Sequence, residues 1–83
     1  MLNVSFSNQA EKYLKKLDEV TIKRILEKIE KLSENPFIQD TKRYEGTPYF
    51  RVRVGKQRII YEVDKASNFL GIVKIEKRER AYD

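Results

Sequence analysis

Hydrophobic and polar positions follow two different periods along this 83-residue chain. Residues 2–6 alternate between apolar and polar side chains, a pattern that predicts a short strand. Residues 8–17 instead carry apolar side chains at spacings of three and four, which predicts an amphipathic helix. Ser7 and Asn8 are its candidate N-caps, and Asn8 with Glu11 resembles a capping box.

A second amphipathic helix is predicted between Asp18, which can cap its start, and Asn35-Pro36, which ends it. After the following loop the period changes to two, which predicts strands. Gly55-Lys56 is expected to form a tight turn between the first two of them. These strands are expected over residues 49–54, 58–63 and 70–77.

The elements are therefore expected in the order β-α-α-β-β-β, within a single domain that spans residues 1–83. Each helix has one apolar stripe and the sheet has one apolar face, so both helices are predicted to pack on one side of an antiparallel sheet. The predicted fold class is α+β. The alternation assigns to the packed face Phe50, Val52, Val54, Ile59, Tyr61, Val63, Gly71, Val73 and Ile75, and to the other face Ile60, Glu62, Ile72, Lys74 and Glu76.

The other face of the predicted sheet also collects arginine side chains. Arg51 and Arg53 share it with Tyr49, Arg58 lies on the neighbouring strand, and Arg78 follows the last strand. An isolated pair of outward arginines would ordinarily be solvated charges that protect a sheet edge. Four guanidinium groups on one surface are instead typical of phosphate or nucleic-acid binding.

Charge is distributed unevenly along the chain. There are 18 Lys and Arg against 13 Asp and Glu, which gives a net charge of +5. Residues 1–41 contribute seven of each sign, so the whole excess lies in residues 42–83, together with six of the seven arginines. A positive second half fits a nucleic acid, and it fits an acidic protein partner equally well.

The composition excludes several kinds of site. The chain has no Cys and no His, so a disulfide, a Cys/His zinc site, a thiol nucleophile, an imidazole base and a Ser-His-Asp triad are all excluded. Any catalysis must use Arg, Lys, Tyr or carboxylate side chains. Uncharged apolar stretches are far shorter than the ~18 residues of a membrane span, and no signal peptide opens the chain. We therefore expect a soluble cytoplasmic protein with no membrane partner.

Several segments resemble one known family, the RelE/ParE superfamily of toxins from toxin–antitoxin pairs. Residues 51–55 read Arg-Val-Arg-Val-Gly and residues 58–61 read Arg-Ile-Ile-Tyr, which is similar to the family signature. Residues 77–82, Lys-Arg-Glu-Arg-Ala-Tyr, are similar to the basic tail of the RelE branch, although Glu76-Lys77 replaces the glycine usual before it. The resemblance covers essentially the whole chain and implies a RelE-like fold, similar to that of microbial RNases.

The resemblance implies a ribosome-dependent endoribonuclease, or mRNA interferase, that cuts mRNA in the decoding (A) site and stops translation. In the family's chemistry the ribose 2′-hydroxyl attacks its own phosphodiester, which leaves a 2′,3′-cyclic phosphate and a 5′-hydroxyl without a metal or cofactor. The implied partners are the ribosome, its mRNA and a RelB-like antitoxin, which neutralises the toxin in a heterotetramer.

Carried over by position, the resemblance implies five catalytic residues. Arg51 and Arg53 are the basic pair of the first signature strand, and Arg58 binds phosphate. Arg78 is the general acid, and Tyr82 orients the substrate. Because arginine does not deprotonate, the general base stays open; its candidates are Tyr82, Tyr61, Glu79 and ribosomal RNA. Further RNA contacts are expected from Tyr49, Lys56, Lys77 and Arg80.

Two other functions stay open. A ParE-like toxin would have the same fold but would bind DNA gyrase without being an enzyme. The chain could also be an inactive toxin homologue or a basic RNA-binding domain. The arginine-rich face and the basic tail favour the RNase, because the gyrase-directed branch usually lacks that set.

Overall fold

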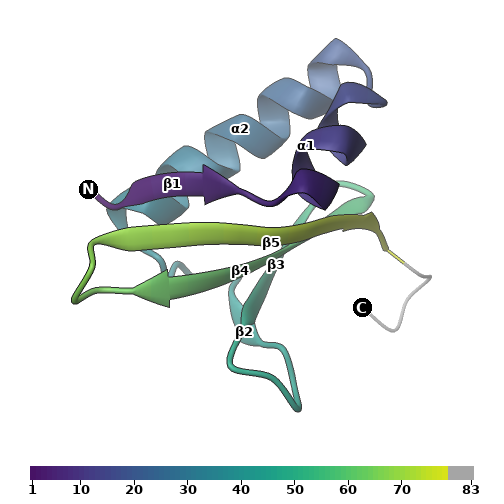
Figure 1. Cartoon of the computed structure of the whole chain (residues 1–83). Helices are drawn as coiled ribbons and strands as arrows, with labels where there is room; N and C mark the ends of the chain where they lie inside the picture. Colours follow the sequence, from purple (N-terminus) through teal and green to yellow (C-terminus); the bar gives the residue numbers. More distant parts are fainter. Residues whose placement is uncertain (79–83) are drawn as a thin grey trace.

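The structure is a computed structural model that describes residues 1–78. Two helices, α1 (Asn8–Lys15) and α2 (Glu19–Glu34), cover one face of a five-stranded sheet (Figure 1). The predicted α+β class is therefore confirmed. The strands are β1 (Asn3–Phe6), β2 (Lys42–Arg43), β3 (Phe50–Val54), β4 (Gln57–Asp64) and β5 (Phe69–Lys77).

The sheet has the strand order β1-β5-β4-β3-β2. The predicted antiparallel arrangement is confirmed for β3, β4 and β5. β1 pairs with β5 in parallel, with Asn3 opposite Phe69, so the complete sheet is mixed. The sequence did not predict β2, which pairs antiparallel with β3, because a strand of two residues is too short to show a period.

Both helices begin at side-chain caps. The Ser7 hydroxyl oxygen accepts a hydrogen bond from the Ala10 amide at 3.1 Å and donates one to the Val73 carbonyl at 2.7 Å. Ser7 is therefore the N-cap of α1, and the predicted capping box that begins at Asn8 is not the cap. The second hydrogen bond of the Ser7 hydroxyl also ties the start of the helix to β5. Asp18 caps α2, as predicted.

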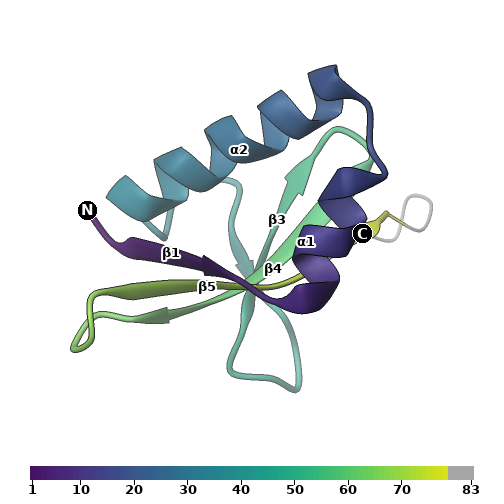
Figure 2. The same cartoon turned by 45° about the horizontal axis from the view of Figure 1, so that its top comes forward.

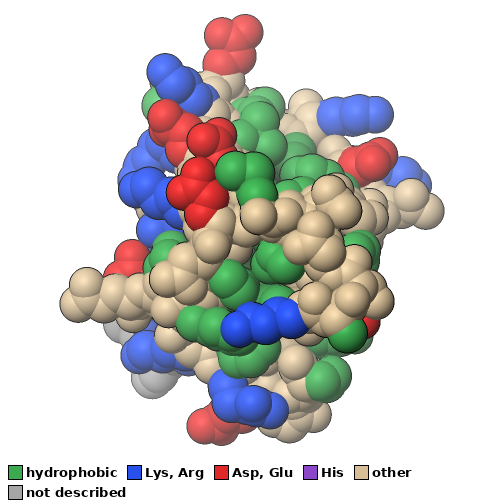
Figure 3. All heavy atoms as spheres, turned by 90° about the vertical axis from the view of Figure 1, so that its left-hand side faces the viewer, with side chains coloured by type: hydrophobic (Ala, Val, Ile, Leu, Met, Phe, Trp, Pro, Cys, Tyr) green, Lys and Arg blue, Asp and Glu red, His purple; other side chains and the backbone are tan. Residues whose placement is uncertain are grey.

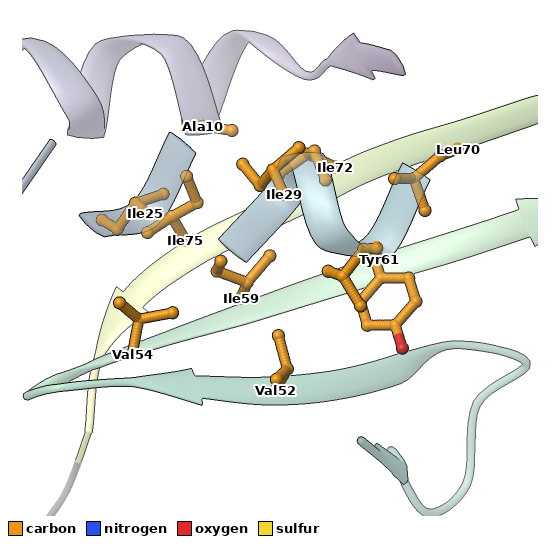
Figure 4. Packing of buried hydrophobic residues seen from close by; sticks show 11 residues of the cluster. Ala10, Ile25, Ile29, Val52, Val54, Ile59, Tyr61, Leu70, Ile72 and Ile75 are labelled. Atoms are coloured by element: carbon orange, nitrogen blue, oxygen red, sulfur yellow. The ribbon is translucent and has the colours of Figure 1, made fainter. Parts of the chain in front are cut away.

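The hydrophobic core lies between the helices and the sheet (Figure 4). Ala10 comes from α1, and Ile25, Ile29 and Leu32 come from α2 at helical spacing. All four side chains are buried. Their partners on β3 and β4, on the predicted face, are Val52, Val54, Ile59 and Tyr61, with Phe50 and Val63 partly buried beside them.

A bulge in β5 corrects the predicted face of that strand. Ile60 pairs with Lys74, but the next residue, Tyr61, pairs with Ile72, so Val73 is an extra residue on β5. One extra residue reverses the alternation of side chains along a strand. The core residues of β5 are therefore Leu70, Ile72 and Ile75, and not the predicted Gly71, Val73 and Ile75.

Alanine substitutions on either side of the bulge test this correction. Ile72→Ala is expected to lower the free energy of unfolding by about 2–5 kcal/mol, because the side chain is buried in the core. Val73→Ala is expected to cost about 1 kcal/mol or less, because Val73 is only partly buried. Urea unfolding of both variants measures the difference. If Val73→Ala lowers the free energy of unfolding more than Ile72→Ala does, the assignment of the bulge is wrong.

The surface mixes hydrophobic and charged side chains. Figure 3 shows this at the end of the molecule that carries the N-terminus and the β4–β5 turn. Exposed large hydrophobic residues include Met1, Val20 and Phe37. Within residues 1–78, no helix is both long enough and apolar enough to cross a membrane.

Candidate functional site

The sheet face that turns away from the helices carries the candidate site. The register places Arg53 directly opposite Arg58, and Arg58 directly opposite Glu76. Arg51 lies two residues before Arg53 on β3 and so shares its face. Arg51, Arg53 and Arg58 therefore lie together on adjacent strands, as the alternation predicts, and we call them the arginine face.

Glu76 binds Arg58 with one carboxylate oxygen and Lys74 with the other. Arg58 donates to Glu76 Oε2 from Nε, at 2.8 Å, and also from Nη2, while Lys74 Nζ lies 3.1 Å from Oε1. The side chains of Arg58 and Glu76 are 15% and 21% exposed, so solvent screens the pair only in part. Burial raises the pKa of Glu76, but the hydrogen bonds from Arg58 and Lys74 outweigh burial and lower it overall. Glu76 is thus ionised at neutral pH and offsets the repulsion between Arg58 and Arg53.

An open hollow lies between the arginine face and the hairpin that joins β2 to β3. This hairpin extends away from the helices (Figure 2). This hairpin hollow has a volume of about 1220 Å³, and both Arg51 and Arg58 line it. The Arg58 guanidinium carbon lies over the Tyr44 ring, 5.7 Å from its centroid. Cationic walls of this kind suit a phosphate group, and an aromatic ring nearby can stack on a base.

Tyr44 and Glu76 are site residues that the sequence analysis did not single out. Tyr49, expected there to contact RNA, is not among the residues that line the hairpin hollow. Its carbonyl accepts a hydrogen bond from the Tyr44 amide at 3.0 Å, so the backbones of the two tyrosines pair across the hairpin. For Tyr44 the available signal was an aromatic residue in the loop shortly before the first signature strand. For Glu76 it was the opposite charge of Arg58 on the neighbouring strand.

Arg78 lies at the turn between β3 and β4. Its amide donates to the Lys56 carbonyl at 2.8 Å, and its Nη1 donates to the Gly55 carbonyl at 3.1 Å. Gly55 has a φ of 58°, which the predicted two-residue turn requires and which glycine adopts without strain. Arg78 is thus close to the cross-strand pair of Arg53 and Arg58, although it does not line the hairpin hollow.

Two lysines that were expected to contact RNA lie elsewhere. Lys56 and Lys77 line a hollow on the helix side of the sheet, together with Tyr13 of α1. The Tyr13 hydroxyl donates to Gln57 Oε1 at 2.6 Å in the same place. The structure therefore does not bring these lysines together with the arginine face. Three further predicted site residues lie outside the described residues: Glu79, Arg80 and Tyr82.

Tyr61, one of the candidate bases, is a core residue. Its side chain is fully buried, and its hydroxyl donates to the Pro36 carbonyl at 2.6 Å (Figure 4). Burial raises its pKa to about 12. Tyr61 therefore keeps its proton at neutral pH, on the opposite side of the sheet from the arginine face.

Comparison with known proteins gives a consistent result. The sequence model of a family described as the ParE toxin of type II toxin–antitoxin systems, parDE, matches residues 4–82. A protein of Methanocaldococcus jannaschii named as the toxin RelE1 is 38% identical over 84 residues, covering 96% of this chain and 93% of that protein. The chain belongs to the RelE/ParE superfamily of toxins.

Solved structures in this superfamily share the fold. A chain from the archaeal RelE–RelB complex of Pyrococcus horikoshii matches with a TM-score of 0.85 and 30% identity, covering 96% of this chain and 98% of that one. A chain from the heterotetrameric YoeB–YefM complex of Staphylococcus aureus matches with a TM-score of 0.73 and 26% identity, covering 95% and 99%. The RelE-like fold that the resemblance implied is therefore confirmed.

The resemblance led us to expect a glycine before the basic tail, and this chain has Glu76 and Lys77 there. β5 continues through both residues. The Glu76 carboxylate binds Arg58, the arginine that the resemblance assigns to phosphate. This ion pair is therefore part of the surroundings of a candidate catalytic residue.

Proposed function

We propose that this chain is the toxin of a type II toxin–antitoxin system and a ribosome-dependent endoribonuclease that cuts mRNA in the decoding site. Membership of the superfamily supports the toxin role. The observation that carries the nuclease proposal is that Arg51 and Arg58 line one hollow with Tyr44. This arrangement offers guanidinium groups to a phosphate and a ring to a neighbouring base.

The proposed reaction depends mainly on charge stabilisation. The ribose 2′-oxygen bonds to the adjacent phosphorus while the bond from phosphorus to the 5′-oxygen breaks. The products are a 2′,3′-cyclic phosphate and a 5′-hydroxyl. Negative charge grows on the phosphoryl oxygens in between, and the guanidinium groups of Arg51 and Arg58 stabilise it. Arg53, opposite Arg58 in the register, adds to the positive field.

Two protons move in this reaction, one from the 2′-hydroxyl and one to the 5′-oxygen. The resemblance assigns the second transfer to Arg78. Tyr82, Glu79 and ribosomal RNA are the candidate acceptors of the first. Glu76 is a weak base because its ion pair lowers its pKa, and Tyr61 is buried with a raised pKa.

Tyr61→Phe tests the exclusion of this tyrosine from the reaction. The variant is expected to lose about 1–3 kcal/mol of unfolding free energy, because the buried Pro36 carbonyl loses its donor. Cleavage is expected to stay at the wild-type rate, because the hydroxyl does not face the arginine face. Urea unfolding and a cleavage assay check the two parts. A variant that loses cleavage but keeps its stability would show that the Tyr61 hydroxyl takes part in the reaction.

We also propose that a RelB-like antitoxin neutralises this chain in a heterotetramer. The P. horikoshii relative comes from a RelE–RelB complex, and the S. aureus relative from a heterotetrameric YoeB–YefM complex. The gene is expected to have a neighbouring short reading frame whose product co-purifies with the toxin. Co-expression followed by light scattering measures the stoichiometry. A toxin that elutes alone would contradict the proposal.

A ParE-like toxin that binds DNA gyrase is the second candidate. The observation in its favour is that the matching sequence model describes ParE toxins. Such a toxin has no need of an arginine-lined hollow, so arginine substitutions would separate the two. An inactive homologue or a basic RNA-binding domain is the remaining alternative.

Cleavage of mRNA by the purified protein, with and without programmed ribosomes, tests the proposal. Primer extension maps the 5′ ends, and Arg78→Ala serves as the control. Cuts that fall inside codons, require ribosomes and vanish in the variant would support the RNase. If the folded protein does not cut, the RNase proposal is wrong and inhibition of gyrase is tested next.

A further inference from the structure

Three hollows follow one another from the arginine face to α2, and each shares lining residues with the next. The hairpin hollow shares Lys42 and Arg51 with a second hollow of about 400 Å³, which Arg53 also lines. Arg53 in turn lines a third hollow of about 210 Å³ against α2. Because neighbouring hollows share these side chains, the three lie next to one another along β3, and we call the third hollow the α2 groove.

One stripe of α2 forms the outer wall of the α2 groove. Arg24, Lys28 and Lys31 follow each other at spacings of four and three, so they lie on the same side of the helix. Arg24 reaches the β3–β4 turn, where its Nη1 lies 3.3 Å from the place a Cβ on Gly55 would take. Lys28 Nζ lies 3.3 Å from Asp40 Oδ2, and the Lys28 side chain is 19% exposed. Two of the three cations are thus positioned by contacts with neighbouring segments.

The chemistry of the α2 groove suits a polyanion. Among the described residues that line it, four side chains are cationic and Glu27 is acidic, and Val54 and Gly55 make up the rest. A protein partner ordinarily inserts apolar or aromatic anchors into pockets, and this lining offers little apolar surface for them. A nucleic-acid strand instead presents a negative charge at every nucleotide.

We propose that the α2 groove binds the sugar–phosphate backbone of RNA beyond the nucleotide that is cut, with Arg24, Lys28 and Lys31 as phosphate contacts. The inference rests on the proposed function in one respect, because the same RNA would occupy the hairpin hollow. Contacts of this kind position the strand without reading its bases, and they weaken as salt increases.

The test compares two triple variants that lose the same charge. One has glutamine at the three α2 positions. The matched control has glutamine at three exposed positions of α1 and its C-cap: Lys12, Lys15 and Lys16. The probes are 2′-O-methyl oligouridines of about 4 and about 12 nucleotides, which cover the usual range of single-strand sites. These probes lack the nucleophile and cannot be cut, so fluorescence anisotropy measures binding alone.

The α2 variant is expected to bind the longer probe roughly tenfold more weakly near physiological salt. Its log–log salt slope is expected to be smaller by about 2, for three lost contacts to a single strand. The shorter probe and the α1 variant are expected to change little. Equal weakening in both triple variants would assign the effect to net charge and overturn the inference. Unchanged RNA binding with lost antitoxin binding would assign the groove to the antitoxin, which also overturns it.

A variant that removes a negative charge, where the triple variants remove positive ones, strengthens the test. Asp40→Asn removes the carboxylate that binds Lys28 and is expected to raise affinity for the longer probe a few-fold, whereas Glu11→Gln on α1 should not. No gain would count against the groove. A protein that binds in this pattern but does not cleave mRNA refutes the proposed function alone. A protein that cleaves while the α2 variant binds normally refutes the groove alone.

Discussion

Alanine in place of Arg58 is expected to lower ribosome-dependent cleavage by about 10²–10³-fold. Arg58 lines the hairpin hollow, and Glu76 and Tyr44 hold its guanidinium in place. Removing one preorganised donor to the charge that develops in a transition state has a cost of this order. Arg58→Lys is expected to recover only part of the rate, because an ammonium group lacks the planar fork of arginine.

This loss must be separated from unfolding. Arg58→Ala leaves the Glu76 carboxylate with Lys74 but without its main partner, which destabilises the fold. The double variant Arg58→Ala/Glu76→Gln removes that charge, and we expect it to recover stability without recovering cleavage. Lys12→Ala, on the exposed surface of α1, is the matched control. Wild-type cleavage by the double variant would show that Arg58 takes no part in the reaction.

Glu76→Gln is expected to lower the free energy of unfolding by about 1.5–3 kcal/mol at neutral pH, the usual range for hydrogen bonds to charged groups. Glutamine keeps the size of the side chain but removes the negative charge that both Arg58 and Lys74 bind. Arg58, which is 15% exposed, then loses this counter-ion while Arg53 remains opposite it. The repulsion between the positive charges of Arg53 and Arg58 is then no longer offset by a carboxylate.

The effect of Glu76→Gln is expected to depend on pH. The pKa of Glu76 is lower in the folded protein than its ordinary value of 4.5, so the unfolded chain holds this proton more tightly. The stability that the carboxylate contributes is therefore complete above pH 4.5 and is lost as the pH falls through the folded-state pKa. Asp18, whose pKa is lowered by hydrogen bonds from Thr21, adds an acid dependence that the variant retains.

Urea unfolding of wild type and Glu76→Gln, at neutral pH and at a series of acid values, measures this dependence. The two free energies are expected to converge as the pH falls. Glu62→Gln, which removes an exposed carboxylate from β4, is the matched control and should show no such convergence. A difference that stays constant across the series would rule out the ion pair as its source.

Local sequence patterns were sufficient to predict both helices and the strands β3, β4 and β5. The Asp18 cap and the Gly55-Lys56 turn were predicted because each depends on residues a few positions apart. The parallel partner of β1 was not predicted, because Asn3 and Phe69 are distant in the chain and no local pattern links them. The same holds for the bulge at Val73, which reversed the predicted faces within β5.

In the candidate site, too, some features could be predicted from the sequence and others depend on the tertiary structure. The period of two along β3 and β4 was enough to place Arg51, Arg53 and Arg58 on one face, and the lack of His and Cys limited the available chemistry. The tertiary structure alone decided that the β2–β3 hairpin puts Tyr44 beneath Arg58, and that the β4–β5 register puts Glu76 beside it. Periodicity and caps arise from neighbours along the chain, so they can be read from sequence. Register, bulges and ion pairs between strands arise from contacts between distant segments, and alternation shows which face a side chain takes without showing what lies opposite it.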